Sequence, residues 1–133
     1  MICLVPVLAP AMMAARAPAP PMTNVIGRWI NPKGSVTVET QPCGAHLCGK
    51  VDWVSADALK DARDAGVPSP IGIQLLQDYA RSPSGVWHGR VYVPDLGRTF
   101  SSTITVENPD TLKISGCILA GLICKSQLWH RQS

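Results

Sequence analysis

The sequence VWHGRVYVPDLGRTFSSTITVE, residues 86–107, decides the fold class, because two runs of alternating side chains flank one turn. The first run places two valines, a tryptophan and a glycine on a single face: Trp87, Gly89, Val91 and Val93. The second run leaves mostly threonine and serine on one face and places on the other Phe100, Ser102, Ile104 and Val106. Pro94 and Gly97 lie between the runs and are typical turn residues. A period of two with one apolar face predicts two antiparallel strands joined as a hairpin.

Short alternating runs continue on both sides of this hairpin. The predicted strands cover residues 25–30, 35–41, 49–54, 71–79, 86–93, 98–107, 111–116 and 123–131. Residues 43–49 are predicted to form a tight connection, and a short surface helix is predicted from a cap at Ser55 to an end at Gly66. About eight strands joined mostly by short turns predict an all-β, antiparallel, eight-stranded barrel, because closure removes exposed sheet edges.

Composition bounds the class of protein. The chain has 133 residues, of which 46% are apolar and 16% are charged, so it suits one folded domain and not a disordered polar chain. The 11 glycines and 12 prolines argue against a helical bundle. Lysine and arginine exceed aspartate and glutamate by three without forming a dense basic stripe, so we expect no nucleic-acid partner.

Residues 1–22 differ from the rest and form a leader that precedes a single domain at residues 23–133. They contain one charged residue, Arg16, together with five prolines and six alanines. The uncharged run at residues 1–15 is too short to span a bilayer comfortably, but it suits the apolar region of a secretory signal. The alternative is a disordered Ala/Pro leader. We expect an exported protein, periplasmic or secreted, with no membrane span after processing.

Four of the five cysteines remain once Cys3 leaves with the leader. Four residues separate Cys43 from Cys48, and six separate Cys117 from Cys124. In an exported protein, an even number of closely spaced cysteines indicates disulfides. Three pairings are possible, and the local one is the simplest. A zinc site built from the four thiolates is the rival, but structural zinc favours pairs with only two residues between the cysteines, so we expect no metal. Free buried cysteines are the alternative for a chain that stays in the cytoplasm.

Several fragments, taken in order, resemble a known bacterial family. They are residues 27–29 (GRW), 36–39 (VTVE), 43–53 (CGAHLCGKVDW), 71–76 (IGIQLL), 87–100 (WHGRVYVPDLGRTF), 112–117 (LKISGC) and 129–131 (WHR). Together they resemble the domain of unknown function 2147 family over roughly residues 27–131. The resemblance implies a small lipocalin-like (calycin-like) barrel in exported or envelope proteins, with no established activity. The chain departs from the family at residues 64–70, where members often carry a longer polar segment.

A tryptophan on the first predicted strand and an arginine on the last can meet where a barrel closes. Trp29 would present its ring face to the Arg131 guanidinium, a contact worth about 0.5–2 kcal/mol depending on desolvation. Lipocalins use a similar Gly-x-Trp motif and a late arginine. Both residues are therefore expected to be structural.

The barrel interior is the candidate ligand site. An eight-stranded barrel encloses little more than its own side chains or one small ligand. The expected lining residues are Val36, Val38, Val51, Trp53, Trp87, Val91, Phe100 and Ile104. One hypothesis is an interior site for a small, mostly apolar molecule. The other is a structural or protein-interaction module of the envelope with a packed barrel. Five aromatic side chains could line a pocket under the first hypothesis and simply fill the barrel under the second: Trp29, Trp53, Trp87, Phe100 and Trp129.

The sequence offers no catalytic constellation. It has no Gly-x-Ser-x-Gly elbow and no pair of acidic residues with an evident acid/base role. The histidines lack the spacing of a metal site and are expected at the surface: His46, His88 and His130. Arg90, Arg98 and Tyr92 could hold an anion, although a solvated strand face is the simpler interpretation. We expect no enzyme and no cofactor, and the protein partner stays open.

Overall fold

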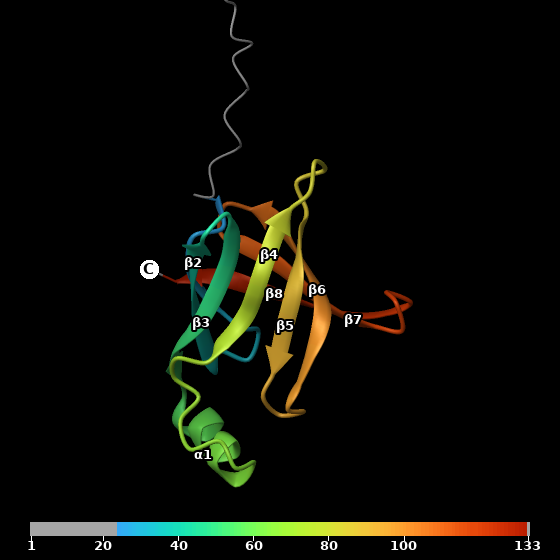
Figure 1. The fold of residues 1–133 in the computed structure, drawn as a ribbon. Helices are drawn as coiled ribbons and strands as arrows, with labels where there is room; N and C mark the ends of the chain where they lie inside the picture. Colours follow the sequence, from blue (N-terminus) through green and yellow to red (C-terminus); the bar gives the residue numbers. More distant parts are fainter. Residues whose placement is uncertain (1–23, 133) are drawn as a thin grey trace, which may run out of the picture.

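The computed structural model describes residues 24–132 and contains one closed antiparallel barrel with a single helix outside it (Figure 1). The strands are β1 (Gly27–Ile30), β2 (Val36–Cys43), β3 (His46–Val54), β4 (Gln74–Arg81), β5 (Trp87–Val93), β6 (Arg98–Asn108), β7 (Thr111–Ile118) and β8 (Ile123–Gln132). Helix α1 (Ala56–Asp64) lies between β3 and β4. The predicted eight-stranded, all-β antiparallel barrel with one short helix is confirmed. The predicted leader, residues 1–22, lies outside the described residues.

The strand order determines at which end of the barrel each connection lies. The strands follow one another around the barrel in chain order, and β1 pairs with β8. Antiparallel neighbours reverse direction at every turn, so the β1–β2, β5–β6 and β7–β8 turns share one end with the segment that carries α1. We call this the open end. The β2–β3, β4–β5 and β6–β7 turns lie at the other end, the closed end, with the start of β1 and the end of β8.

The first hairpin is longer than the sequence pattern predicts. The prediction of a tight connection at residues 43–49 is wrong, because β2 continues to Cys43, β3 starts at His46, and only Gly44 and Ala45 form the turn. Gly44 has a positive φ of 65°, which glycine adopts without the steric cost of a Cβ. Cys43 and His46 therefore face each other as the last pair of the ladder.

Both local cysteine pairs form disulfides. Cys43 and Cys48 have Cα atoms 5.8 Å apart, and Cys117 and Cys124 have Cα atoms 4.1 Å apart. Cys117 and Cys124 are also direct partners in the register of β7 and β8, so this bond links two strands of one hairpin. Loops this short stabilise a fold by about 2 kcal/mol each, through lost freedom of the unfolded chain.

Helix α1 begins and ends for local reasons. The Ser55 hydroxyl accepts a hydrogen bond of 3.1 Å from the backbone N–H of Ala58, which satisfies one of the free donors of the first turn. Asp57 and Arg63 complement the two ends of the helix dipole. No residue of the helix is buried, as its few apolar residues predict.

The barrel closes at the ladder between β1 and β8. Trp29 lies opposite Val38 of β2 on one side and opposite Arg131 of β8 on the other. Its side chain is only 1% exposed. The Arg131 guanidinium carbon lies 4.3 Å from the centroid of the Trp29 ring, so the two residues make the cation–π contact expected from the sequence.

Arg131 also binds backbone from two other segments. Its Nη1 donates to the carbonyl of Ile26 at 2.8 Å, and its Nε donates to the carbonyl of Pro109 at 3.0 Å. The guanidinium thus joins β8 to the segment before β1 and to the β6–β7 turn. A Cβ at Gly27 would collide with this guanidinium, so glycine leaves the space that Arg131 occupies.

The core fills the barrel with large side chains. Its buried members are Val25, Trp29, Val38, Leu47, Val51, Leu75, Leu76, Tyr79, Trp87, Ile104, Leu112, Ile114 and Trp129. Tyr79 packs over Gly89, where a Cβ would lie 2.6 Å from the ring. Burial raises the pKa of Tyr79, and the neighbouring Ser102 offsets only part of this, so the phenol stays neutral.

Replacement of the seam tryptophan should show how much stability closure contributes. We expect Trp29→Ala to lower the free energy of unfolding by about 3–5 kcal/mol, because it leaves a large buried cavity and removes the partner of Arg131. Trp53→Ala is the matched control, since Trp53 is 42% exposed and should cost much less. Urea denaturation of both variants measures the difference. Equal losses would mean that Trp29 does not hold the seam.

Candidate ligand cavity

A cavity of about 640 Å³ lies at the open end of the barrel. Its wall comes from six strands and two turns. The lining residues are Asn31, Val36, Leu75, Leu76, Val91, Tyr92, Val93, Pro94, Asp95, Leu96, Phe100, Ile114, Gly116, Ile118, Ile123, Lys125, Gln127 and Trp129. Most of them are apolar, and the volume is in the range of sites that bury a small organic ligand.

The alternation of β7 and β8 builds one wall of this cavity. Ile114, Gly116 and Ile118 share one face of β7 and lie opposite Gln127, Lys125 and Ile123 of β8 in the register. Successive side chains of a strand point to opposite faces, so every second residue reaches the cavity. Gly116 has no side chain, and the Cβ it lacks would sit 3.5 Å from Cγ1 of Val91, which leaves room on the cavity side.

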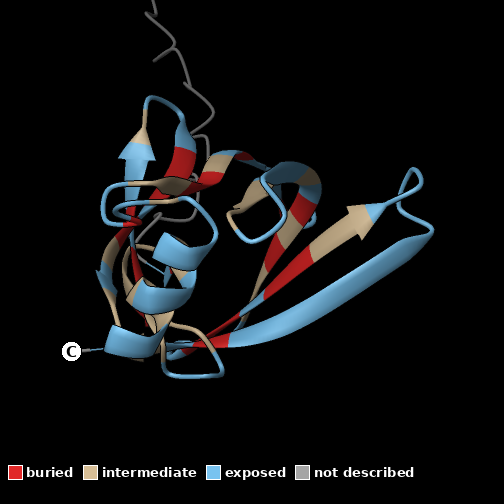
Figure 2. Cartoon of the chain, turned by 90° about the horizontal axis from the view of Figure 1, so that it is seen from below, coloured by how far each residue is buried: buried red, intermediate tan, exposed pale blue. Residues whose placement is uncertain are grey.

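The cavity opens beside β8 because β1 is short. Only His130, Arg131 and Gln132 of β8 pair with β1 in the described residues. The remaining part of β8, residues 123–129, pairs with β7 alone. In the view from below, this exposed length of β8 runs away from the barrel (Figure 2). Asn31 and Val36, from the far side of the gap, line the same cavity as Lys125 and Gln127.

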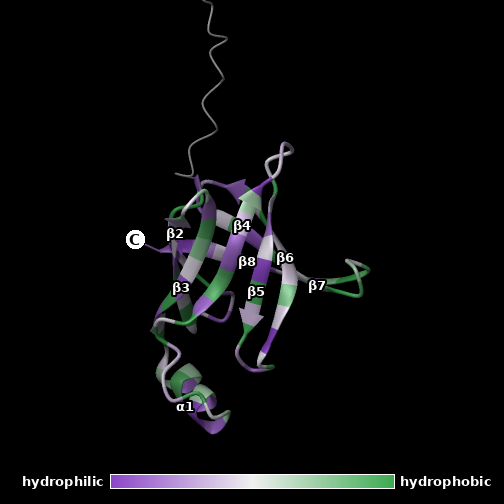
Figure 3. Ribbon diagram, in the orientation of Figure 1, coloured by the Kyte–Doolittle hydropathy of each residue, from purple (hydrophilic) through white to green (hydrophobic). Residues whose placement is uncertain are grey.

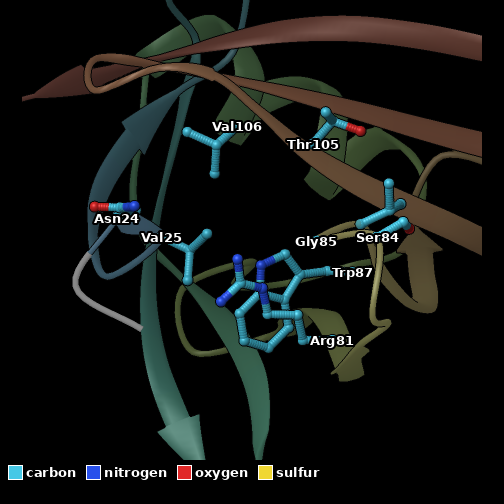
Figure 4. Close-up of a pocket in the computed structure, with 9 residues that line it drawn as sticks. Asn24, Val25, Arg81, Ser84, Gly85, Trp87, Thr105 and Val106 are labelled. Carbon is cyan, nitrogen blue, oxygen red and sulfur yellow. The ribbon is translucent and has the colours of Figure 1, made fainter. Parts of the chain in front are cut away.

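A smaller cavity of about 230 Å³ lies at the closed end (Figure 4). Its lining residues are Asn24, Val25, Arg81, Ser84, Gly85, Val86, Trp87, Thr105 and Val106. They come from the segment before β1, the end of β4, the β4–β5 turn, the start of β5, and β6. The volume is below the usual range of small-molecule sites, so the open-end cavity is the stronger candidate.

The structure divides the eight predicted lining residues among four places: the open-end cavity, the packed core, the closed-end cavity and the outer surface. Val36, Val91 and Phe100 line the open-end cavity. Val38, Val51 and Ile104 are buried in the packed core, outside the lining of either cavity. Trp87 is buried as well and lines the smaller, closed-end cavity. The sequence pattern identified inward faces but not the level of each residue along the barrel axis.

The interior position predicted for Trp53 is wrong. Val38 pairs with Val51, whereas its neighbour Thr37 pairs with Trp53, so Asp52 is an extra residue in β3. Such a bulge shifts the alternation by one position. Trp53 therefore shares the outer face with Thr37, and it is 42% exposed.

Polar contacts on the outer face hold this bulge. The Arg28 Nε donates to Oδ2 of Asp52 at 2.6 Å, and the Thr37 hydroxyl donates to Oδ1. Burial raises the pKa of Asp52, but the hydrogen bonds from Thr37 and Arg28 and the charge of Arg28 outweigh it. The net pKa is below the usual value for aspartate, so the carboxylate stays ionised in the folded state.

This lowered pKa predicts an acid-dependent contribution to stability. A group with a depressed folded pKa stabilises the fold fully above its unfolded pKa and loses that contribution as the pH falls through the folded value. We expect Asp52→Asn to cost about 1 kcal/mol at pH 7, because Arg28 is partly exposed. The cost should shrink as the pH falls below about 4. Urea unfolding at several pH values, with the exposed Asp64→Asn as control, measures this effect. A cost that does not change with pH would contradict it.

Several lining residues were missed by sequence reasoning. No inward face is assigned from the sequence to the two predicted strands that carry Ile114 and Ile123. Ile118 lies beyond residue 116, where the first of these strands is predicted to end, although β7 continues to it. The alternation of apolar and other residues in residues 112–118 is the sequence pattern that could have identified the inward face of β7. Trp129 is among the aromatic residues that could either line a pocket or fill the barrel, but it is not among the expected lining residues. It lines the cavity, and its Nε1 donates to Oε1 of Gln127 at 3.2 Å.

The charged and metal-type residues form no evident reactive centre within residues 24–132. Arg90 pairs with Asp78 at 3.4 Å on the surface, and Arg98 stacks on Phe100 with its guanidinium carbon 5.7 Å from the ring centroid. The one described cluster with metal-ligand atoms joins Asp78 to the disulfide of Cys43 and Cys48, whose sulfurs are already bonded to each other. His46, His88 and His130 are all exposed.

The barrel has a counterpart among protein families. The family model described as "Uncharacterized protein conserved in bacteria (DUF2147)" matches residues 27–131. The chain belongs to this family. The DUF2147 match runs from the start of β1 almost to the end of β8, so it includes every strand of the barrel. The family resemblance of the sequence is confirmed.

The fold is also similar to that of a solved structure. The chain is similar to protein HP1028 from the human pathogen Helicobacter pylori, which is described as belonging to the lipocalin family. The TM-score is 0.60 at 16% sequence identity, with 81% of this chain and 82% of the other covered. At this identity the similarity shows a lipocalin-like fold alone. The comparison with curated proteins finds no match. Within residues 24–132, no helix has the length and apolar character needed to cross a membrane.

Proposed function

We propose that this DUF2147 protein is a non-enzymatic carrier or receptor that holds a small, mostly apolar molecule in its open-end cavity. The cavity of about 640 Å³ is the observation that supports this proposal most directly. A space of that size with an apolar wall gains free energy when it buries apolar ligand surface, at about 25 cal/mol per Å². The lipocalin-like fold is compatible with such a ligand.

The polar residues of the cavity favour a ligand with one polar group. Lys125 and Gln127 line the wall formed by β8, and Asp95 lies in the β5–β6 turn at the rim. The apolar side chains of Leu76, Val91 and Ile114 lie on neighbouring strands of the same cavity. An extended apolar body with a polar or anionic head beside Lys125 would fit this distribution of side chains.

The alternative function, an envelope module with a fully packed barrel, has less support. Its packed interior matches the closed half of the molecule, where Trp29, Tyr79 and Leu47 are buried. It does not account for the space at the open end. A protein partner on the outer surface is compatible with an occupied cavity, so the two roles do not exclude each other.

The disulfides support a location outside the cytoplasm, in the periplasm or beyond, because such bonds persist in oxidising compartments. Protein recovered from the periplasm of a bacterial host should give two linked peptides on mapping without reduction, one joining Cys43 to Cys48 and one joining Cys117 to Cys124. Four free thiols in that material would reject the two disulfides, and with them the argument for this location.

Ligand binding is tested with a fluorescent apolar probe, N-phenyl-1-naphthylamine. We expect its fluorescence to rise on binding to the wild type and its affinity to fall about tenfold in Gly116→Ile. The new side chain would start 3.5 Å from Cγ1 of Val91 and fill space inside the cavity. Native mass spectrometry of the exported protein should also show a retained molecule that denaturation releases.

A matched control separates filling of the cavity from a change in the fold. Ser101→Ile introduces the same side chain on β6, at an exposed position next to the β7 strand. It should leave the probe affinity unchanged. Absence of probe binding by the wild type, or equal affinity in wild type and Gly116→Ile, would refute an interior apolar site.

A further inference from the structure

The β7–β8 hairpin ends in an apolar tip that projects sideways from the body of the barrel (Figure 1). The tip, residues 118–123, has the sequence ILAGLI and contains no polar or charged side chain. Figure 3 shows it as a hydrophobic loop away from the body of the barrel. Its large side chains are 44–84% exposed: Ile118, Leu119, Leu122 and Ile123. Single exposed apolar residues are common, but a contiguous cluster of four marks an interaction site.

The tip is fixed in this exposed form. The disulfide between Cys117 and Cys124 closes its base, and Ile118 pairs with Ile123 directly above that bond. Inside the turn, the N–H of Gly121 donates to the carbonyl of Ile118 at 3.2 Å, and the N–H of Leu122 donates to that of Leu119 at 3.1 Å. The apolar side chains therefore cannot fold back easily onto the barrel.

The backbone of the tip is also unfavourable for the isolated chain. Leu119 and Ala120 both have a φ of 53°, a region that residues with a Cβ rarely adopt. The fold thus accepts a local cost to hold large apolar side chains in water. A strained, exposed and stapled apolar turn is typical of a segment whose contacts are completed by something outside the chain.

The charge around the tip indicates the chemistry of its partner. From residue 111 to the end of the chain there is no aspartate or glutamate. Lys125 directly follows the stapled segment, and Lys113 lies on the adjacent strand. An aliphatic tip followed by basic side chains matches a membrane with anionic lipids, whose acyl region and headgroups lie in that order.

We propose that the apolar tip inserts into the surface of a lipid bilayer that contains anionic lipids. The side chains of the tip offer no hydrogen-bond donor or acceptor to a protein partner, whereas acyl chains need none. The two turn hydrogen bonds reduce the cost of carrying backbone into the interface. Ile118 and Ile123 also line the open-end cavity, so insertion would turn that cavity toward the membrane. The proposal does not depend on the ligand proposed above.

Vesicle flotation tests this docking with the full chain. Vesicles of phosphatidylcholine alone are compared with vesicles that also contain phosphatidylglycerol. We expect the wild type to bind the anionic vesicles more tightly, and Leu122→Asp to weaken that binding by about tenfold or more. Leu122 is 84% exposed and has no positive φ, so the substitution leaves the fold intact. Ile71→Asp, at a 49% exposed site between α1 and β4, carries the same charge change and should bind like the wild type.

A second pair of variants measures whether the tip itself enters the bilayer, independently of any binding by the leader. Lipids brominated in their acyl chains should quench the added tryptophan fluorescence in Leu122→Trp, but not in Ile71→Trp. Equal quenching in the two variants would overturn the proposal. So would a wild type that ignores vesicles but forms dimers that Leu122→Asp dissociates, because the tip would then be a contact between two copies.

Discussion

The β1–β8 seam is the contact on which the barrel depends. β1 has four residues and shares three register pairs with β8, so the backbone ladder that closes the sheet is short. Trp29 and Arg131 compensate at this point, because the ring and the guanidinium stack while Arg131 binds the carbonyls of Ile26 and Pro109. Side-chain packing at one pair thus supplies what a longer ladder would otherwise provide.

The same short seam explains why the two halves of the molecule differ. Where β1 and β8 are paired, large side chains meet across the barrel and the closed half is packed around Trp29. Beyond Ile30 the chain turns into β2, and β8 continues without a partner on that side. The wall separates there and the cavity appears, lined by Asn31 and Val36 on one side and Gln127 on the other. One geometric limit, the length of β1, therefore accounts for both the packed half and the half that contains the larger cavity.

Sequence reasoning reached the barrel because alternation, turn residues and cysteine spacing are local signals that agreed with one another. It also found the seam pair and three lining residues, Val36, Val91 and Phe100. It misplaced Trp53, because nothing local in the sequence marks Asp52 as the extra residue of a bulge. The contacts that hold the bulge come from Arg28 and Thr37, which are distant in sequence. Sequence reasoning also could not tell which inward-facing residues lie in the packed core and which line the cavity. That depends on the height of each residue along the barrel axis, which is set by the register between strands.

The β7–β8 hairpin shows how one sequence feature can serve two purposes. Spacing alone explains the cysteines at 117 and 124 as a staple, and the structure contains that staple. A disulfide needs no apolar residues between its cysteines, and polar residues in the turn would expose less apolar surface to water. The chain instead places Leu119 at a positive φ and leaves Leu122 mostly in water. Because these choices weaken the isolated fold while the disulfide preserves their geometry, the hairpin is better explained by what it contacts than by what it stabilises.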